Sequence, residues 1–118
     1  MPTIKSFTQL FVWQKAHILA LNIYKMTGNF PKREIFGLTD QLRRAAVSVS
    51  ANIAEGFKRI SPKEQLRFYN IAASSLEELY AELLLAKDLG YLPSLDIKAF
   101  QLRDETSKLL HTWLRRIK

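Results

Sequence analysis

The 118-residue sequence has no cysteine and no long apolar run. The absence of cysteine excludes disulfides, thiolate metal ligands and thiol nucleophiles, and it is typical of proteins in a reducing compartment. The longest uninterrupted apolar stretches are only a few residues, far too short to span a membrane, and the first residues do not resemble a secretion signal. These features predict a cytoplasmic protein with no membrane partner.

Glycine and proline are scarce, with four of each, and they fall mainly in three stretches, at residues 28–37, 56–62 and 90–93. Because both residue types interrupt regular structure, four long intervals remain for helices. Apolar residues recur in these intervals at spacings of three and four, less regularly in the fourth, and no interval alternates with a period of two. We therefore expect no strand and four helices, at about 8–27, 39–55, 62–89 and 95–116.

Residues typical of helix ends support these boundaries. Ser61, Pro62 and Glu64 form the most specific signal, an N-cap serine followed by proline and then by glutamate three residues after the cap. Other predicted helix starts are Thr39 with Asp40 and Ser94 with Asp96, and the predicted left-handed C-terminal caps are Gly28, Gly56 and Gly90. A hydrophobic content of 47% can supply the core of one domain, residues 1–118. Short connections favour an antiparallel, up-down-up-down four-helix bundle.

The sequence contains none of the common catalytic or metal-binding motifs. The two histidines, His17 and His111, lack the Glu-x-x-His spacing of carboxylate-bridged metal sites in bundles, and we expect ordinary surface or boundary roles for them. No Gly-x-Ser-x-Gly turn and no phosphate-binding glycine loop occurs. We therefore expect no catalytic residue, no metal and no cofactor, so that an enzyme is the third of three functional interpretations.

Basic residues predominate, with 18 lysines and arginines against 11 acidic residues and a net charge of +7. In an up-down-up-down bundle both termini and the connection between the second and third helices lie at the same end. That end gathers a cluster that we call the basic pole: Lys5, Lys58, Arg59, Lys63, Arg67, Arg115, Arg116 and Lys118. Such a cluster favours RNA or DNA. The alternative is a solvated basic tail that interacts with the dipole of the last helix.

The second helix carries a polar row beside its apolar stripe. Its members are Gln41, Arg44, Ser48, Asn52 and Glu55, and the third helix offers Ser75 and Glu78, with their neighbours Ser74 and Glu77, as partners. The row predicts a hydrogen-bonded network between the two helices. The alternative interpretation is a groove for a ligand or a partner.

Two helices also carry apolar residues outside their main stripes. These are Phe11, Ile18, Leu21 and Tyr24 in the first helix, and Leu66, Ile71, Leu84 and Leu85 in the third. Because a bundle buries one stripe per helix, a second stripe predicts a homo-oligomer. The alternative is a single, wide buried face on each helix.

Several segments resemble a known family. They include Gln41-Leu42-Arg43-Arg44-Ala45-Ala46, Asn52-Ile53-Ala54-Glu55-Gly56 and Leu89-Gly90-Tyr91-Leu92, together with residues 7–16 and 73–79. The chain is similar over nearly its whole length to the bacterial proteins encoded in intervening sequences of 23S ribosomal RNA genes. The resemblance implies a four-helix bundle and ring-like homo-oligomers, expected to be pentamers. A related group consists of accessory proteins of diversity-generating retroelements that bind nucleic acid and a reverse transcriptase, which suggests by analogy a similar protein partner here.

The leading hypothesis is therefore a non-enzymatic accessory protein that binds RNA or DNA through the basic pole as a homo-oligomer. The runner-up is a structural or protein-interaction scaffold whose positive charge mainly provides solubility. Salt-dependent binding to RNA distinguishes the two hypotheses.

Overall fold

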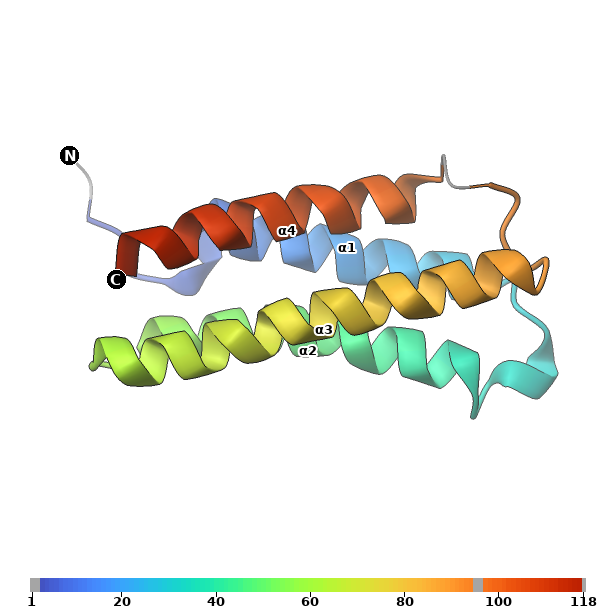
Figure 1. The fold of residues 1–118 in the computed structure, drawn as a ribbon, viewed down its shortest axis with the longest axis horizontal. Helices are drawn as coiled ribbons and strands as arrows, with labels where there is room; N and C mark the ends of the chain where they lie inside the picture. The colour runs from blue at the N-terminus through green and yellow to red at the C-terminus, as the bar shows by residue number, and fades with distance from the viewer. Residues whose placement is uncertain (1–2, 95–96, 118) are drawn as a thin grey trace.

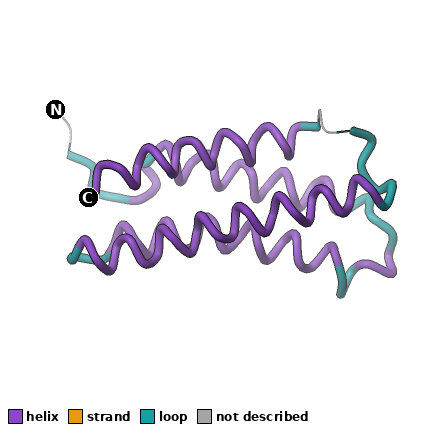
Figure 2. The backbone as a smooth tube through the Cα atoms, viewed as in Figure 1, coloured by secondary structure: helices purple, strands orange, loops and turns teal. Residues whose placement is uncertain are grey.

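Four helices, alternating in direction, make up most of the chain (Figure 1). The computed structural model describes residues 3–94 and 97–117. The helices are α1 (Phe11–Thr27), α2 (Leu38–Lys58), α3 (Pro62–Asp88) and α4 (Lys98–Ile117), with short 3-10 helices η1 (Phe7–Gln9) and η2 (Lys32–Glu34). No strand occurs within the described residues (Figure 2). The prediction of an all-α four-helix bundle is confirmed.

The helices are arranged around a common axis in chain order. α2 packs against α1 and α3, and α4 packs against α3 and α1. Between the described parts of α1 and α3, or of α2 and α4, no backbone contact occurs, so each of these pairs occupies opposite corners of the bundle. The resulting body measures 46 × 24 × 20 Å. Both termini and the α2–α3 connection lie at one end, and the other two connections lie at the opposite end (Figure 1).

The core consists of the apolar stripes that the helical spacing predicts. The fully buried large side chains include Leu19, Ile23, Leu42, Val49, Ile53, Tyr69, Leu76, Leu79, Leu83 and Leu110. Arg103 interrupts the stripe of α4, where it is buried, donates from Nε to the Leu76 carbonyl at 3.1 Å and lies over the Tyr80 ring. A guanidinium in this seam explains why the apolar spacing of the last helix is irregular.

Two of the predicted helix ends are confirmed in detail. Ser61 caps α3, with the Glu64 N–H donating to Ser61 Oγ at 3.2 Å and Pro62 at the first helical position. At the other end of α3, Gly90 has a φ of +84°. The Gly90 and Tyr91 N–H groups donate to carbonyls of the last turn, those of Lys87 and Ala86, both at 2.9 Å. This pair of bonds is a Schellman motif, which requires the left-handed conformation that glycine adopts at little cost.

The predictions for the other two glycines are wrong. Gly28 follows α1 with right-handed dihedral angles, φ −60° and ψ −21°. Gly56 lies inside α2, which continues to Lys58 instead of ending near residue 55. A Cβ atom at Gly56 would lie only 2.5 Å from Cε1 of Tyr69. Gly56 is therefore required by the close approach of the Tyr69 ring on α3, and not by a helix end.

The predicted starts of the other helices need correction as well. α1 begins at Phe11 and not near residue 8, because a capping box between Ser6 and Gln9 closes η1 and leaves Leu10 extended. α2 begins at Leu38, whose N–H donates to the Glu34 carboxylate at 3.2 Å, while Thr39 is buried and does not cap the helix. α4 begins at Lys98, and Asp96, half of its predicted start, lies outside the described residues.

Candidate nucleic-acid interface

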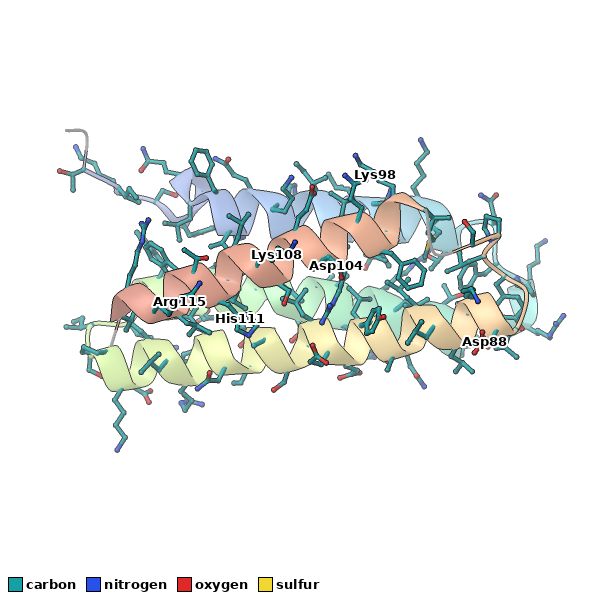
Figure 3. All side chains as sticks on the ribbon, turned by 45° about the horizontal axis from the view of Figure 1, so that its top comes forward. Asp88, Lys98, Asp104, Lys108, His111 and Arg115 are labelled. Carbon is teal, nitrogen blue, oxygen red and sulfur yellow. The ribbon has the colours of Figure 1, made fainter. Side chains whose placement is uncertain are left out.

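The topology places the described members of the basic pole at one end of the bundle. Lys5 precedes η1, the α2–α3 connection follows Lys58, and Arg115 and Arg116 lie in the last turn of α4. Figure 3 shows Arg115 near the end that holds the termini, whereas Asp88 lies near the opposite end. Lys118 lies outside the described residues.

Lys5 and Lys58 come together although 53 positions separate them in the sequence. Both line one surface hollow, together with Phe7, Ala54 and Phe57. The N-terminal segment reaches α2 because η1 packs against it. On the other side of this segment, Ile4 and Arg116 line a second hollow between α1 and α4. The N-terminal segment thus connects cations from α2 and α4 at the same end of the bundle.

Arg59 and Arg67 share one aromatic ring. Their Cζ atoms lie 4.6 and 4.4 Å from the centroid of the Phe68 ring, which is half-buried. Each guanidinium also pairs with a carboxylate one helical turn away, Arg59 with Glu55 at 2.8 Å and Arg67 with Glu64 at 3.2 Å. These contacts hold the two guanidiniums in place and partly neutralise them. The hydrogen bond from Arg67 also lowers the pKa of the Glu64 carboxyl.

The remaining described cations of the basic pole have no carboxylate partner within the described part of the chain. They are Lys5, Lys58, Lys63, Arg115 and Arg116. All five are exposed. An exposed ammonium or guanidinium without a carboxylate keeps its full charge for a phosphate, so these five side chains carry most of the available positive potential.

The rest of the molecule is close to neutral. Apart from the eight members of the basic pole and the two carboxylates beside them, Glu55 and Glu64, the sequence has ten basic and nine acidic residues, out of totals of 18 and 11. Several of these charges form ion pairs, including Lys15 with Glu105 at 3.2 Å and Arg44 with Asp40 at 2.9 Å. Thus nearly all of the net charge of +7 belongs to one end of the bundle.

The opposite end contains mixed charges that are bound to one another. Tyr91 donates from its hydroxyl to Glu34 at 2.8 Å, and this bond, with the Leu38 N–H, lowers the pKa of the Glu34 carboxyl. Arg33 reaches the same Tyr91 hydroxyl at 3.5 Å, and Lys87 pairs with Asp88 at 3.6 Å. This end therefore has a weaker attraction for polyanions than the basic pole.

The predicted polar network between α2 and α3 is present as a small cluster. Ser48 Oγ and Ser75 Oγ lie 2.8 Å apart, and the Asn52 amide donates to Ser48 Oγ at 3.0 Å and to the Ser48 carbonyl at 2.8 Å. The other members of the row have different surroundings. Arg44 and Glu55 pair with residues of their own helix end, Gln41 is exposed, and Glu78 lies beside Glu82. One surface hollow includes two members of the row, Arg44 and Ser48.

Glu82 is a buried acidic residue of α3. In the sequence, Glu77, Glu78 and Glu82 form a carboxylate cluster that is typical of a solvated helix face or of a partner for arginine, and the prediction of a solvated face is wrong for Glu82. Its side chain is 9% exposed, and its Oε1 atom has no hydrogen-bond partner among the described residues. Burial, together with the neighbouring Glu78 carboxylate, raises the pKa of Glu82 to about 7. Among the described residues it belongs to no group of three side chains that could hold a metal ion.

The histidines lie at the surface, as expected. His17 stacks on Trp13 with ring centroids 4.8 Å apart, and His111 Nδ1 lies 2.8 Å from the Ser107 carbonyl. Within residues 3–94 and 97–117, no three histidine, aspartate or glutamate side chains gather where they could hold a metal ion. None of the described helices is both long and apolar enough to cross a membrane.

Apolar side chains remain exposed on α1 and α3. On α1, Phe11 is 78% exposed and Ile18, Leu21 and Tyr24 are about half exposed. On α3, Ile71 and Leu85 are exposed, whereas Leu84 packs against the core. The second stripe of α1 is therefore a surface feature, and the wide buried face considered as an alternative does not describe this helix.

Two features of the basic pole were missed from the sequence. The pairing of Arg59 with Phe68 brings together residues on two sides of a turn, so no local spacing indicates it. Ile60, the residue after Arg59, is exposed at the tip of the α2–α3 connection. An isolated isoleucine in a short polar connection was the available signal for this second feature.

Fold and surface together define the class of this protein: a four-helix bundle whose net positive charge is concentrated at one end. The chain belongs to the 23S rRNA-intervening sequence protein family, whose model matches residues 8–112. It is similar to a solved structure from Bacteroides thetaiotaomicron, a protein of unknown function from the S23 ribosomal protein family. The identity is 25% and the TM-score 0.77, over 88% of this chain and 98% of that chain. No curated protein matches the chain. The family resemblance noted from the sequence is confirmed.

Proposed function

We propose that this protein is a non-enzymatic accessory protein that binds RNA or DNA through its basic pole and does so as a homo-oligomer. The single observation that supports binding is the segregation of charge. Seven described cations lie at one end beside Glu55 and Glu64. Apart from these nine residues and Lys118, the sequence has ten basic and nine acidic residues. Phosphate contacts of this kind provide affinity with little sequence preference.

Membership of the family gives a context for this proposal but does not indicate an activity. The family's printed description refers to intervening sequences of 23S rRNA, and the similar solved structure is described as having unknown function. A cytoplasmic protein that acts near ribosomal RNA would meet phosphate at high local concentration. The supporting argument therefore remains electrostatic, and a partner protein such as a reverse transcriptase enters only by analogy.

The test removes four charges from the basic pole. The quadruple variant carries Lys58→Gln, Arg59→Gln, Arg115→Gln and Arg116→Gln. It should bind single-stranded RNA at least ten-fold more weakly near physiological salt, because fewer counterions are released. Fluorescence anisotropy at several salt concentrations measures both the affinity and its salt dependence. The slope of log affinity against log salt should become less steep in the variant.

A matched control removes four charges elsewhere. The control variant carries Lys25→Gln, Lys32→Gln, Arg33→Gln and Lys98→Gln. It lowers the net charge by the same amount, at or near the opposite end. This control should retain most of the affinity and salt dependence. Equal losses in both variants would show that total charge, and not the basic pole, governs binding.

Homo-oligomerisation is supported by the exposed apolar rows. α1 and α3 occupy opposite corners, so the row with Ile18 and Leu21 and the row with Ile71 and Leu85 face away from each other. A contact between the α1 row of one copy and the α3 row of the next would leave one row free on each copy. Such a heterologous contact forms a ring if the rotation between copies closes, and an open filament if it does not. In a ring with parallel subunits the basic poles would share one face, and weak phosphate contacts would combine.

The same exposed rows support the second candidate function, a protein-interaction scaffold without nucleic-acid binding. In that case the apolar rows would bind another protein and the basic pole would provide solubility. The scaffold predicts no RNA binding by the wild-type protein near physiological salt, which the anisotropy measurement would reveal directly.

A further inference from the structure

Ile60 is the most exposed large apolar side chain in the described part of the protein, with 97% of its surface accessible. It lies at the tip of the α2–α3 connection, in the sequence Lys58-Arg59-Ile60-Ser61-Pro62-Lys63. The tip belongs to the end of the bundle that holds both termini (Figure 1). A single exposed apolar side chain is common on protein surfaces, but this one lies among cations that attract phosphate, so a ligand held there would also contact it.

The connection that carries Ile60 is held in one conformation by hydrogen bonds on both sides. The Arg59 N–H donates to the Gly56 carbonyl at 3.2 Å, and the Gln65 side chain donates to the Arg59 carbonyl at 3.0 Å. After the tip, the Gln65 N–H donates to the Ser61 carbonyl at 3.0 Å and the Ser61 hydroxyl caps α3. The exposure of Ile60 is therefore built into the turn.

The cations next to Ile60 are also positioned in advance. The guanidiniums of Arg59 and Arg67 are held by the Phe68 ring and by one carboxylate each. A guanidinium has five N–H donors, so several remain for a phosphate after one or two bonds to a carboxylate. Lys58 and Lys63 add exposed charges on the two sides of the tip.

We propose that Ile60 is an apolar wedge that inserts between unpaired bases of a bound nucleic acid, while the surrounding cations bind its phosphates. This inference rests on the proposed function, since it assumes that the basic pole binds RNA or DNA. Phosphates offer no apolar surface, but the face of an unstacked base does, and apolar side chains act as wedges between bases in other nucleic-acid complexes. A wedge enters a duplex only by unstacking its base pairs, whereas unpaired bases expose their faces at lower cost. The proposed ligand is therefore single-stranded or bulged nucleic acid.

The test compares two substitutions at almost equally exposed apolar residues. Ile60→Ser removes the wedge, and Phe36→Ser is the control, because Phe36 is 94% exposed and lies in the α1–α2 connection at the opposite end. Each variant is titrated by anisotropy against a single strand and a hairpin duplex of equal length. Neither side chain is part of the core, and circular dichroism checks that both variants keep the wild-type helicity.

The wedge predicts that Ile60→Ser weakens single-strand binding about ten-fold, because the apolar side chain is no longer buried against a base. Duplex binding and the slope of log affinity against log salt should not change, since no charge is lost. Phe36→Ser should bind like the wild type. A 2-aminopurine base in the strand should report unstacking with the wild type and less with Ile60→Ser.

Other outcomes would overturn the wedge in ways that can be told apart. Wild-type affinity in Ile60→Ser would exclude insertion, and equal losses for single strand and duplex would exclude a wedge that selects unpaired bases. A wild-type protein that binds neither nucleic acid would overturn the proposed function as well. If it bound anionic vesicles of phosphatidylserine and phosphatidylcholine instead, and Ile60→Ser abolished that binding, the tip would be a membrane contact.

Discussion

Among single residues, Glu82 has the surroundings least suited to its charge. It is an acidic residue buried on α3, its Oε1 atom lacks a hydrogen-bond partner among the described residues, and Glu78 lies beside it. Burial and the neighbouring carboxylate raise its pKa to about 7 from a usual value of 4.5. The folded protein therefore binds a proton at Glu82 more tightly than the unfolded chain does.

This difference predicts that the Glu82 contribution to stability is full below about pH 4.5 and is lost as the pH rises through about 7. Glu82→Gln mimics the protonated carboxyl at every pH. At pH 5 the variant should have about the wild-type free energy of unfolding, and at pH 8 it should be more stable by roughly 1–3 kcal/mol. Urea denaturation at the two pH values measures this.

The exposed residue Asp88 on the same helix provides the control, since Asp88→Asn should not produce the same gain between pH 5 and pH 8. A Glu82→Gln variant with the same stability difference at both pH values would show that the carboxyl titrates normally in the folded protein.

At the scale of elements, α2 and α3 form a close-packed helix pair. The ring of Tyr69 occupies the space that a side chain at position 56 would need, and Ser48 and Ser75 bond directly across the seam. Both features require small side chains on α2 where it faces α3. The turn with Ile60 joins these two helices, so the geometry of the basic pole depends on how α2 and α3 pack.

We expect Gly56→Ala to destabilise the protein by roughly 1–3 kcal/mol, because the added methyl group would collide with the Tyr69 ring. The sign is informative, since glycine to alanine in an exposed helix interior stabilises by up to about 1 kcal/mol. Thermal or urea unfolding gives the free-energy difference.

A double-mutant cycle identifies the cause. Tyr69→Leu removes the ring, and in that background the cost of Gly56→Ala should become smaller or change sign. An equal cost in both backgrounds would mean that the added methyl group disturbs something other than Tyr69.

At the scale of the whole molecule, charge and apolar surface are arranged in different directions. The positive charge is concentrated at one end of the long axis, and the exposed apolar rows lie on opposite sides, along α1 and α3. Copies joined side by side through these rows would keep their basic ends free. This arrangement allows oligomerisation and polyanion binding to occur together.

The heterologous contact leads to a mixing experiment. Ile18→Gln with Leu21→Gln removes the α1 row, and Ile71→Gln with Leu85→Gln removes the α3 row. Each double variant alone should be monomeric at micromolar concentration, and an equimolar mixture should form one-to-one pairs, because each pair retains a single intact junction. Analytical ultracentrifugation measures the masses.

The wild-type protein, which should be larger than a dimer, is the reference. If the α3 variant alone kept the wild-type mass, the contact would use α1 surfaces only. A monomeric wild type at the same concentration would refute the homo-oligomer.

Much of the fold, and part of the candidate site, could be predicted from the sequence. The periodicity and the placement of glycine and proline predicted four helices, and the Ser61 cap and the Gly90 turn were confirmed in detail. Gly56 was misinterpreted because a glycine at a helix end and a glycine under a neighbouring ring are identical in sequence. The polar row was only partly recovered as a network, since the ion pairs of Arg44 and Glu55 within their own helix ends compete with partners on α3.

By itself, the sequence determined the class of fold, because helix periodicity and turn residues are local properties. It also determined the end at which positive charge gathers, because the order of antiparallel helices decides which connection shares an end with the termini. Only the tertiary structure decided how residues distant in sequence meet: Lys5 with Lys58 around one hollow, Arg59 and Arg67 on the Phe68 ring, and Tyr69 against Gly56. It also decided which apolar residues remain exposed, including Ile60. The physical reason is that burial and side-chain pairing depend on the relative rotation and separation of packed helices, which no single helix encodes.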